Sequence, residues 1–74
     1  MYKRQEEEIA VADLPAVVAA AALSAVPGGT IVEAERETEA GVVVYEVEVE
    51  TAAGEFEVEV SEAGEVLELS LIHI

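Results

Sequence analysis

Residues 42–60 read VVVYEVEVETAAGEFEVEV, a pattern that predicts a β-hairpin. Apolar residues alternate with glutamates along both arms, and the small residues 51–54 separate the two arms. Successive side chains of a strand point to opposite faces, so one face of the hairpin is apolar and the other carries glutamate. The apolar face has to be covered by another element, while the glutamates lie in water.

The composition is that of one small acidic domain. The chain has 74 residues, a formal net charge of -14 and no cysteine. Disulfides and cysteine-bound zinc are excluded, so packing alone has to hold the fold together. The negative charge repels nucleic acid and anionic membrane surfaces, and we exclude both as direct partners. The apolar residues, 53% of the chain, are patterned rather than scattered, which argues against disorder.

The N-terminal region changes from polar to apolar. Residues 1–8 are polar and show no periodicity, so we expect a disordered lead-in. Residues 9–26 are apolar, but Asp13 and Pro15 leave too short a run to span a bilayer. Three glutamates precede this run where a signal peptide carries positive charge, so we expect neither a signal peptide nor membrane insertion.

An amphipathic helix is predicted at residues 14–26. Asp13 is the expected N-cap, and Pro15 is tolerated in the first turn, where its missing N–H costs little. The Pro-Gly-Gly sequence at residues 27–29 is the stop signal. Residues on one helical face are expected to cover the sheet: Leu14, Val17, Val18, Ala21, Ala22 and Ala25.

The opposite helix face has no charge. It consists of Ala16, Ala19, Ala20, Leu23 and Ser24. Alanine is the best helix former, and scattered exposed apolar residues are ordinary, so one interpretation gives this face no function. The alternative is a docking surface, although the face has no aromatic anchor.

Two further strands complete the predicted sheet. Residues 30–38 form the first strand, with Ile31, Val32 and Ala34 on its apolar side and glutamates toward solvent. Turns are expected at residues 39–41, 51–54 and 61–64, followed by a last strand from Glu65 to about Leu69. Short loops make successive strands antiparallel neighbours. The predicted fold is therefore α+β, with one N-terminal helix packed on a four-stranded antiparallel meander.

Five short segments together resemble a PepSY-like domain, the family likened to the β-lactamase inhibitor protein fold. They are DLP at 13–15, VPGGTI at 26–31, VYEV at 44–47, GEFEVEV at 54–60 and AGEVL at 63–67. The resemblance covers roughly residues 9–68. It implies a non-enzymatic periplasmic or extracellular domain that binds or inhibits a peptidase or other hydrolase. The alternative is a structural or ligand-binding repeat module of a larger envelope protein.

The C-terminal residues 69–74, LSLIHI, resemble a translated transposon-derived sequencing adapter. We therefore predict that residues 69–74 are a non-native tail that is not part of the domain. The alternative is that Leu69 and Leu71 simply continue the last strand. His73 is the only histidine, so the sequence offers neither a zinc ligand set nor a Ser-His-Asp triad.

The candidate partner-binding face consists of Glu46, Glu48, Glu57 and Glu59, which lie side by side if the hairpin arms pair in simple register. Paired carboxylates catalyse proton transfer only in a cleft that separates their pKa values, and calcium needs oxygens that converge from a curved loop. We predict no catalytic, cofactor or metal site. The expected partner is a protein with a basic rim, although a solvated face adapted to salt would look the same.

Overall fold

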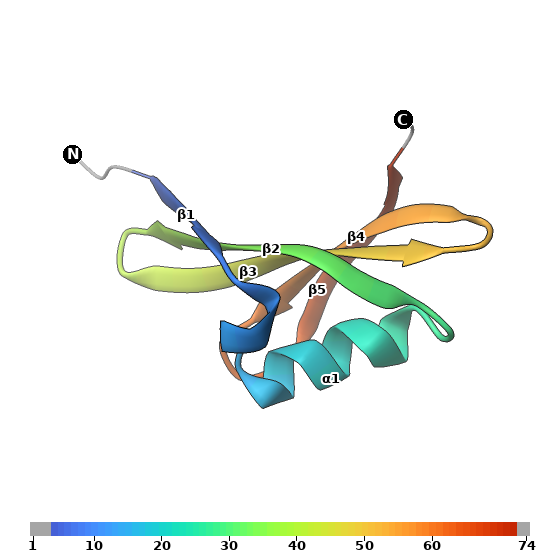
Figure 1. The fold of residues 1–74 in the computed structure, drawn as a ribbon. Helices are drawn as coiled ribbons and strands as arrows, with labels where there is room; N and C mark the ends of the chain where they lie inside the picture. Colours follow the sequence, from blue (N-terminus) through green and yellow to red (C-terminus); the bar gives the residue numbers. More distant parts are fainter. Residues whose placement is uncertain (1–3, 73–74) are drawn as a thin grey trace.

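A helix lies across one face of an antiparallel sheet in the computed structural model, which describes residues 4–72 (Figure 1). The elements are β1 (Gln5–Ile9), η1 (Val11–Asp13), α1 (Ala16–Ala25), β2 (Thr30–Glu39), β3 (Val42–Thr51), β4 (Gly54–Ser61) and β5 (Val66–Ile72). Neighbouring strands follow sequence order, so the sheet is a meander β1-β2-β3-β4-β5. The predicted α+β class is confirmed, but the sheet has five strands rather than four.

The additional strand is β1, in the segment expected to be a disordered lead-in. It pairs antiparallel with β2 from Gln5 opposite Thr38 to Ile9 opposite Ala34. The prediction was wrong for residues 5–8, because any backbone can add to a sheet edge whatever its side-chain pattern. Residues 1–3 lie outside the described part of the chain.

The helix begins later than predicted. Leu14 is extended at φ -67° and ψ 131°, as expected for a residue that precedes proline. The N-cap is consequently Pro15, whose carbonyl accepts hydrogen bonds from the N–H groups of Val18 and Ala19. Asp13 lies in the short 3₁₀ turn η1 and does not cap α1. The predicted stop is confirmed, since α1 ends at Ala25 and Gly28 adopts φ 79°.

The core on this side of the sheet is a single row spaced by four residues, which starts at Leu14, before α1, and ends at Val26, just after it. Its members are Leu14, Val18, Ala22 and Val26, all buried, with Ala21 and Ala25 partly buried beside them. Val17 was expected in this face but is 50% exposed, whereas Ala19, expected on the outer face, packs against the core. The core contact of α1 itself is therefore narrow, with Val18 and Ala22 as its buried residues.

The sheet contributes the larger part of the core. Its buried apolar residues alternate along the strands, as the hairpin pattern predicts: Ala34, Tyr45, Val47, Val49, Val58 and Val60. Ile31 and Ala34 share the core face although three positions separate them. A β-bulge between Ile31 and Glu33 takes up the extra residue, and Val32 is consequently 44% exposed, contrary to expectation.

All three predicted turns are present. Ala40 and Gly41 both have positive φ, 53° and 81°, which is the geometry of a two-residue hairpin turn. The hydroxyl of Thr51 accepts a hydrogen bond from the Ala53 N–H and donates one to the Gly54 carbonyl. In the last turn, the Ser61 hydroxyl accepts from the Glu65 N–H.

Strand β5 continues to Ile72 and pairs with β4 along its length. It therefore includes part of residues 69–74, whose non-native origin stays a prediction. Leu69 and Leu71 face the helix side of the sheet but are 48% and 49% exposed. Among the described residues, none after Val60 is buried, so β5 covers the core edge without contributing a core residue.

Candidate interaction surface

The four candidate glutamates lie on the sheet face that α1 does not cover. Glu46 is opposite Glu59 and Glu48 is opposite Glu57, which confirms the simple hairpin register. All four are partly buried by their neighbours. Their role in binding a partner stays a prediction, but their arrangement as a block of four carboxylates is now defined.

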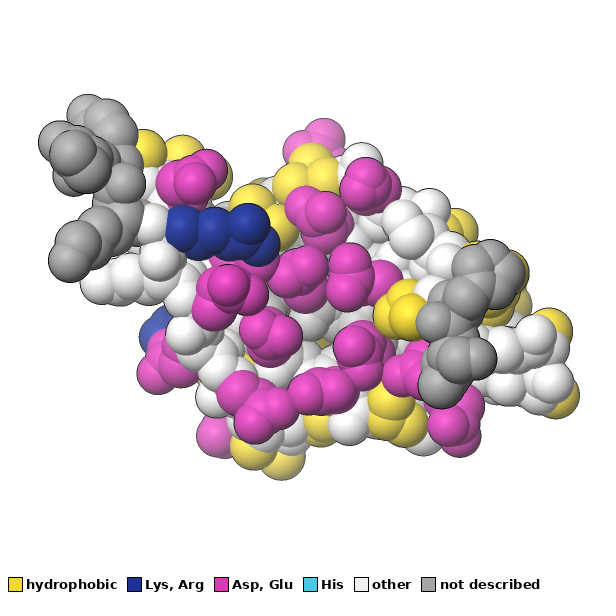
Figure 2. All heavy atoms as spheres, turned by 90° about the horizontal axis from the view of Figure 1, so that it is seen from above, with side chains coloured by type: hydrophobic (Ala, Val, Ile, Leu, Met, Phe, Trp, Pro, Cys, Tyr) yellow, Lys and Arg dark blue, Asp and Glu magenta, His cyan; other side chains and the backbone are white. Residues whose placement is uncertain are grey.

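Strands β1, β2 and β5 extend this block across the sheet. Glu46 and Glu48 are flanked by Glu35 and Glu33 of β2, and Glu59 is flanked by Glu68 of β5. We call the whole set the glutamate face: Glu6, Glu8, Glu33, Glu35, Glu37, Glu46, Glu48, Glu57, Glu59 and Glu68. Figure 2 shows acidic side chains gathered over this side of the molecule.

Glu46 carries the most perturbed carboxyl of the face. A hydrogen bond with Glu37, partial desolvation and the charges of Glu57, Glu37 and Glu35 together raise the pKa of Glu46 to about 8. The same hydrogen bond lowers the pKa of Glu37. Proton binding at Glu46 is therefore favoured in the folded protein, and it reduces the repulsion between the two carboxyl groups.

A second acid pair lies beside the first. The pKa of Glu48 is raised to about 7, first by its hydrogen bond with Glu33 and then by desolvation. Hydrogen bonds with Glu8 and Glu48 lower the pKa of Glu33. Desolvation is the main cause that raises the pKa of Glu59. Hydrogen bonds between carboxyl groups thus raise the pKa of one partner and lower that of the other, and desolvation adds to the raised values.

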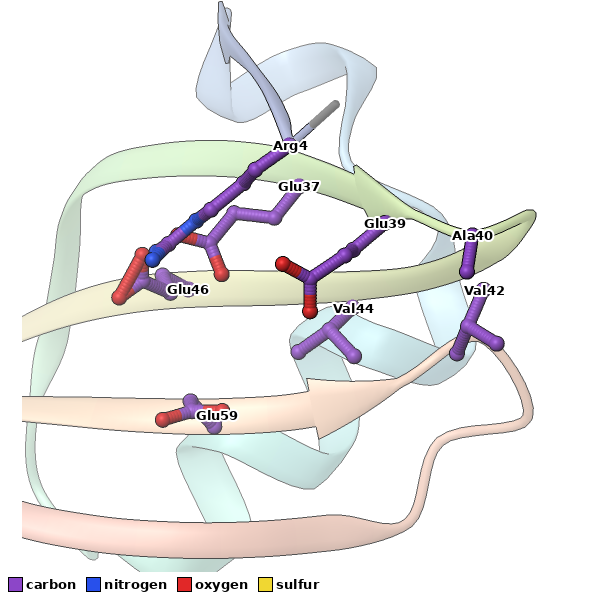
Figure 3. Close-up of a pocket in the computed structure, with 8 residues that line it drawn as sticks. All are labelled: Arg4, Glu37, Glu39, Ala40, Val42, Val44, Glu46 and Glu59. Atoms are coloured by element: carbon purple, nitrogen blue, oxygen red, sulfur yellow. The ribbon is translucent and has the colours of Figure 1, made fainter. Parts of the chain in front are cut away.

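One end of the face is hollowed beside the β2–β3 turn. The hollow has a volume of about 560 Å³ and is lined by Arg4, Glu37, Glu39, Ala40, Val42, Val44, Glu46 and Glu59. Arg4 points over the carboxylates from the start of β1 and forms an ion pair with Glu37 (Figure 3). Val42 and Val44 give the hollow an apolar side, so it fits a long side chain with an aliphatic stem and a cationic end.

Three carboxylates of the face also converge. Oxygen atoms of Glu6, Glu35 and Glu46 lie within 4.8 Å of one another, close enough to share a cation. A calcium ion takes roughly six to eight oxygen ligands, and a flat, partly exposed cluster supplies only part of such a set. We assign no metal to it.

Two other surfaces are less defined. The outer face of α1 is exposed at Ala16, Ala20 and Leu23 and uncharged, as predicted. A second, more apolar hollow of about 460 Å³ lies between the end of α1, the β3–β4 loop, Phe56 and Leu69. Neither surface brings together groups that could carry out chemistry.

The sequence pattern predicts the centre of the glutamate face but not its extent. The glutamates at 33, 35 and 37 occupy alternate positions, so the sequence does indicate that they lie on one face of a strand. Arg4, Glu6 and Glu8 gave no such signal, because the β1 segment has no apolar alternation. Their place on the face depends on the pairing of β1 with β2, between residues about thirty positions apart in the chain.

In its described part, the protein is an α+β domain in which α1 packs on one face of an antiparallel sheet and acidic side chains cover the other face. No helix in the described part of the chain has the length and hydrophobicity needed to cross a membrane. Residues 15–61 match the model of the PepSY family, described as the peptidase propeptide and YPEB domain. Since this match spans more than half of the chain, the protein belongs to the PepSY family, as the resemblance implied. No curated protein and no solved structure matches the chain.

Proposed function

We propose that this domain is a non-catalytic protein-binding module that inhibits or modulates a peptidase or other hydrolase. Its family is associated with peptidase propeptides, a type of domain that is generally non-catalytic and works by binding peptidases. The family is also typically extracellular or periplasmic, and we propose the same location for this chain.

The observation that carries the proposal is the ladder of opposed glutamates on a sheet braced by α1. Glu46 opposite Glu59 and Glu48 opposite Glu57 destabilise the isolated domain through like-charge repulsion. A basic partner would relieve that repulsion on docking. The helix-backed sheet also supplies a rigid surface, which loses little conformational entropy when it binds.

The direct test is capture from an envelope extract of the source organism, followed by inhibition assays on any hydrolase that binds. Reversing Glu46, Glu48, Glu57 and Glu59 to lysine should abolish capture and inhibition while circular dichroism shows an intact fold. With the unmodified domain, added salt should weaken binding mainly through a slower association rate, because the contact is electrostatic.

A matched control separates the face from net charge. Glu46→Lys with Glu59→Lys changes the charge by the same amount as Glu62→Lys with Glu65→Lys, which lie at the β4–β5 loop. Only the first pair should weaken inhibition. If both variants inhibit as strongly as the parent domain, the contact lies instead on the outer face of α1, at Ala16, Ala19, Ala20 and Leu23. Capture of nothing would favour a structural or ligand-binding repeat module.

A further inference from the structure

Strand β1 occupies the edge of the sheet with little to hold it. Four of its five residues are exposed, and Ile9 alone is partly buried against the core. Beyond the backbone ladder with β2, the described side-chain ion pairs are Arg4 with Glu37 and Glu7 with Arg36. A segment with so little burial detaches at low cost in free energy.

The register of β1 on β2 places like charges opposite each other. Glu6 lies opposite Glu37, and Glu8 lies opposite Glu35. Each such pair destabilises the strand pairing, whereas a basic residue in either β1 position would stabilise it. The pKa of Glu8 is raised first by its hydrogen bond with Glu33 and then by the charge of Glu33, and the charge of Glu35 adds a smaller contribution.

Arg4, the residue just before β1, is basic, whereas Glu6 and Glu8 on the same side of β1 are acidic. Its guanidinium pairs with Glu37 and points toward Glu46 in the 560 Å³ hollow (Figure 3). Arg4 thus shows that an extended segment paired with β2 can place a basic side chain in the hollow. Arg4, Glu6 and Glu8 follow one another at alternate positions, so a strand that was basic at all three would match the face throughout.

We propose that the β2 edge is a strand-acceptor site, at which β1 is displaced by an extended partner segment with basic residues at three alternate positions. The segment adds to β2 through main-chain hydrogen bonds and places its basic side chains over Glu35, Glu37 and Glu46. An acidic residue between the last two basic ones replaces Glu7 opposite Arg36, and an apolar residue replaces Ile9. The inference deepens the proposed function, on which it rests for the existence of a protein partner.

The test uses the full chain and a synthetic peptide that copies residues 4–10 with Glu6→Lys and Glu8→Lys. Two control peptides are the unchanged copy and a peptide of the same composition as the basic one, with its lysines at neighbouring positions. The alternating peptide should bind about tenfold more tightly than either control, because two repulsive pairs become attractive. Backbone amide shifts should appear in β2 and in displaced β1.

A variant of the chain itself supplies the second arm. Glu6→Lys with Glu8→Lys in the full chain should hold β1 on β2, slow amide exchange along that ladder and weaken peptide binding at least tenfold. Equal binding of the neighbouring-lysine peptide would show bulk charge attraction and overturn the inference. Amide shifts confined to the β5 edge, or binding unaffected by the variant, would also overturn it.

The result separates this inference from the proposed function. If the peptide fails while a hydrolase is still captured through Glu46, Glu48, Glu57 and Glu59, the strand-acceptor site alone is wrong. If the peptide binds at β2 and no hydrolase is captured or inhibited, the acceptor site stands and the inhibitor proposal fails.

Discussion

At the scale of single residues, Glu46 and Glu48 are the carboxyl groups whose pKa values are raised most by their surroundings. Each lies within a row of carboxylates and is partly shielded from water, so the raised pKa of each lets it retain a proton where an isolated glutamate is ionised. A proton bound more tightly in the folded state than in the unfolded chain links stability to pH.

Stability should therefore fall as the pH rises from about 5 to about 8. The folded pKa values of about 8 for Glu46 and about 7 for Glu48 exceed the ordinary value of 4.5. Their stabilising contribution is complete below the ordinary value and is lost as the pH rises through the folded values. The melting temperature, followed by circular dichroism, should decrease across this interval.

A glutamine variant provides the control for this prediction. Glu46→Gln with Glu48→Gln should flatten the pH dependence and melt higher than the parent at about pH 8, whereas Glu62→Gln with Glu65→Gln should retain the parental slope. Below the ordinary value the trend should reverse, because the lowered pKa values of Glu33 and Glu37 make their protonation destabilising. A melting temperature that is flat from about pH 5 to about pH 8 would contradict the repulsive ladder.

Gly29 is a second residue whose surroundings define a prediction. A Cβ atom at Gly29 would lie 2.3 Å from Cγ1 of Val49, a fully buried side chain, and 3.0 Å from the Val26 carbonyl oxygen. Gly29→Ala should therefore lower the free energy of unfolding by about 1–3 kcal/mol, as overpacking does. Urea denaturation measures the change.

Gly28 is the matched control for that substitution. It has φ 79°, a Cβ atom added to it would meet no atom within 4 Å, and asparagine tolerates positive φ better than other side chains. Gly28→Asn should change stability by no more than about 0.5 kcal/mol. Equal losses at both positions would show that the close approach to Val49 is not what makes Gly29→Ala destabilising.

At the scale of elements, the two edges of the sheet differ in chemistry. Strand β1 is charged and held partly by ion pairs, whereas β5 carries Glu68 as its single charged residue and exposes leucines. Charged edges resist uncontrolled strand addition, and apolar edges invite it. The predicted non-native origin of residues 69–74 would account for the exposure of Leu69 and Leu71, since no core position selected them.

Replacing residues 70–74 with another soluble, strand-compatible sequence should leave the fold intact. No described residue after Val60 is buried, so the replacement removes edge pairing and half-exposed surface but no core contact. We expect a cooperative thermal transition with a loss of no more than about 1 kcal/mol. Loss of the cooperative transition, seen by circular dichroism, would show that the end of β5 belongs to the natural fold.

At the scale of the whole molecule, the net charge of -14 acts against compaction. The glutamates are closer together in the folded sheet than in the extended chain, so screening should favour the folded state. Raising the salt concentration from about 0.01 M to about 1 M shortens the screening length from roughly 30 Å to roughly 3 Å. The melting temperature should rise, by roughly 4–8 °C for each kcal/mol gained.

The glutamate face should account for most of this salt effect. A variant with glutamine at Glu46, Glu48, Glu57 and Glu59 should melt higher at low salt and respond less to added salt. A parent domain whose melting temperature does not change with salt would show that net charge is not what limits its stability.

Much of the architecture followed from local pattern. Period-two alternation predicted the β3–β4 hairpin and the block of four glutamates, and Pro27 with Gly28 marked the end of α1. These features are local because a side chain's face depends only on its position along one strand. The N-terminal limit of α1 was misjudged because the effect of Pro15 on Leu14 outweighed the capping potential of Asp13.

Side-chain periodicity was enough to predict the hairpin, the α+β class and the acidic face. The folded structure was needed to establish the pairing of β1 with β2, the bulge at Val32, and the position of Arg4 beside Glu37 and Glu46. The strand pairing and the bulge depend on backbone hydrogen bonds, which every residue except proline offers in full. The pairing of β1 in turn brings Arg4 to Glu37. The pattern of side chains along the sequence therefore does not predict these features.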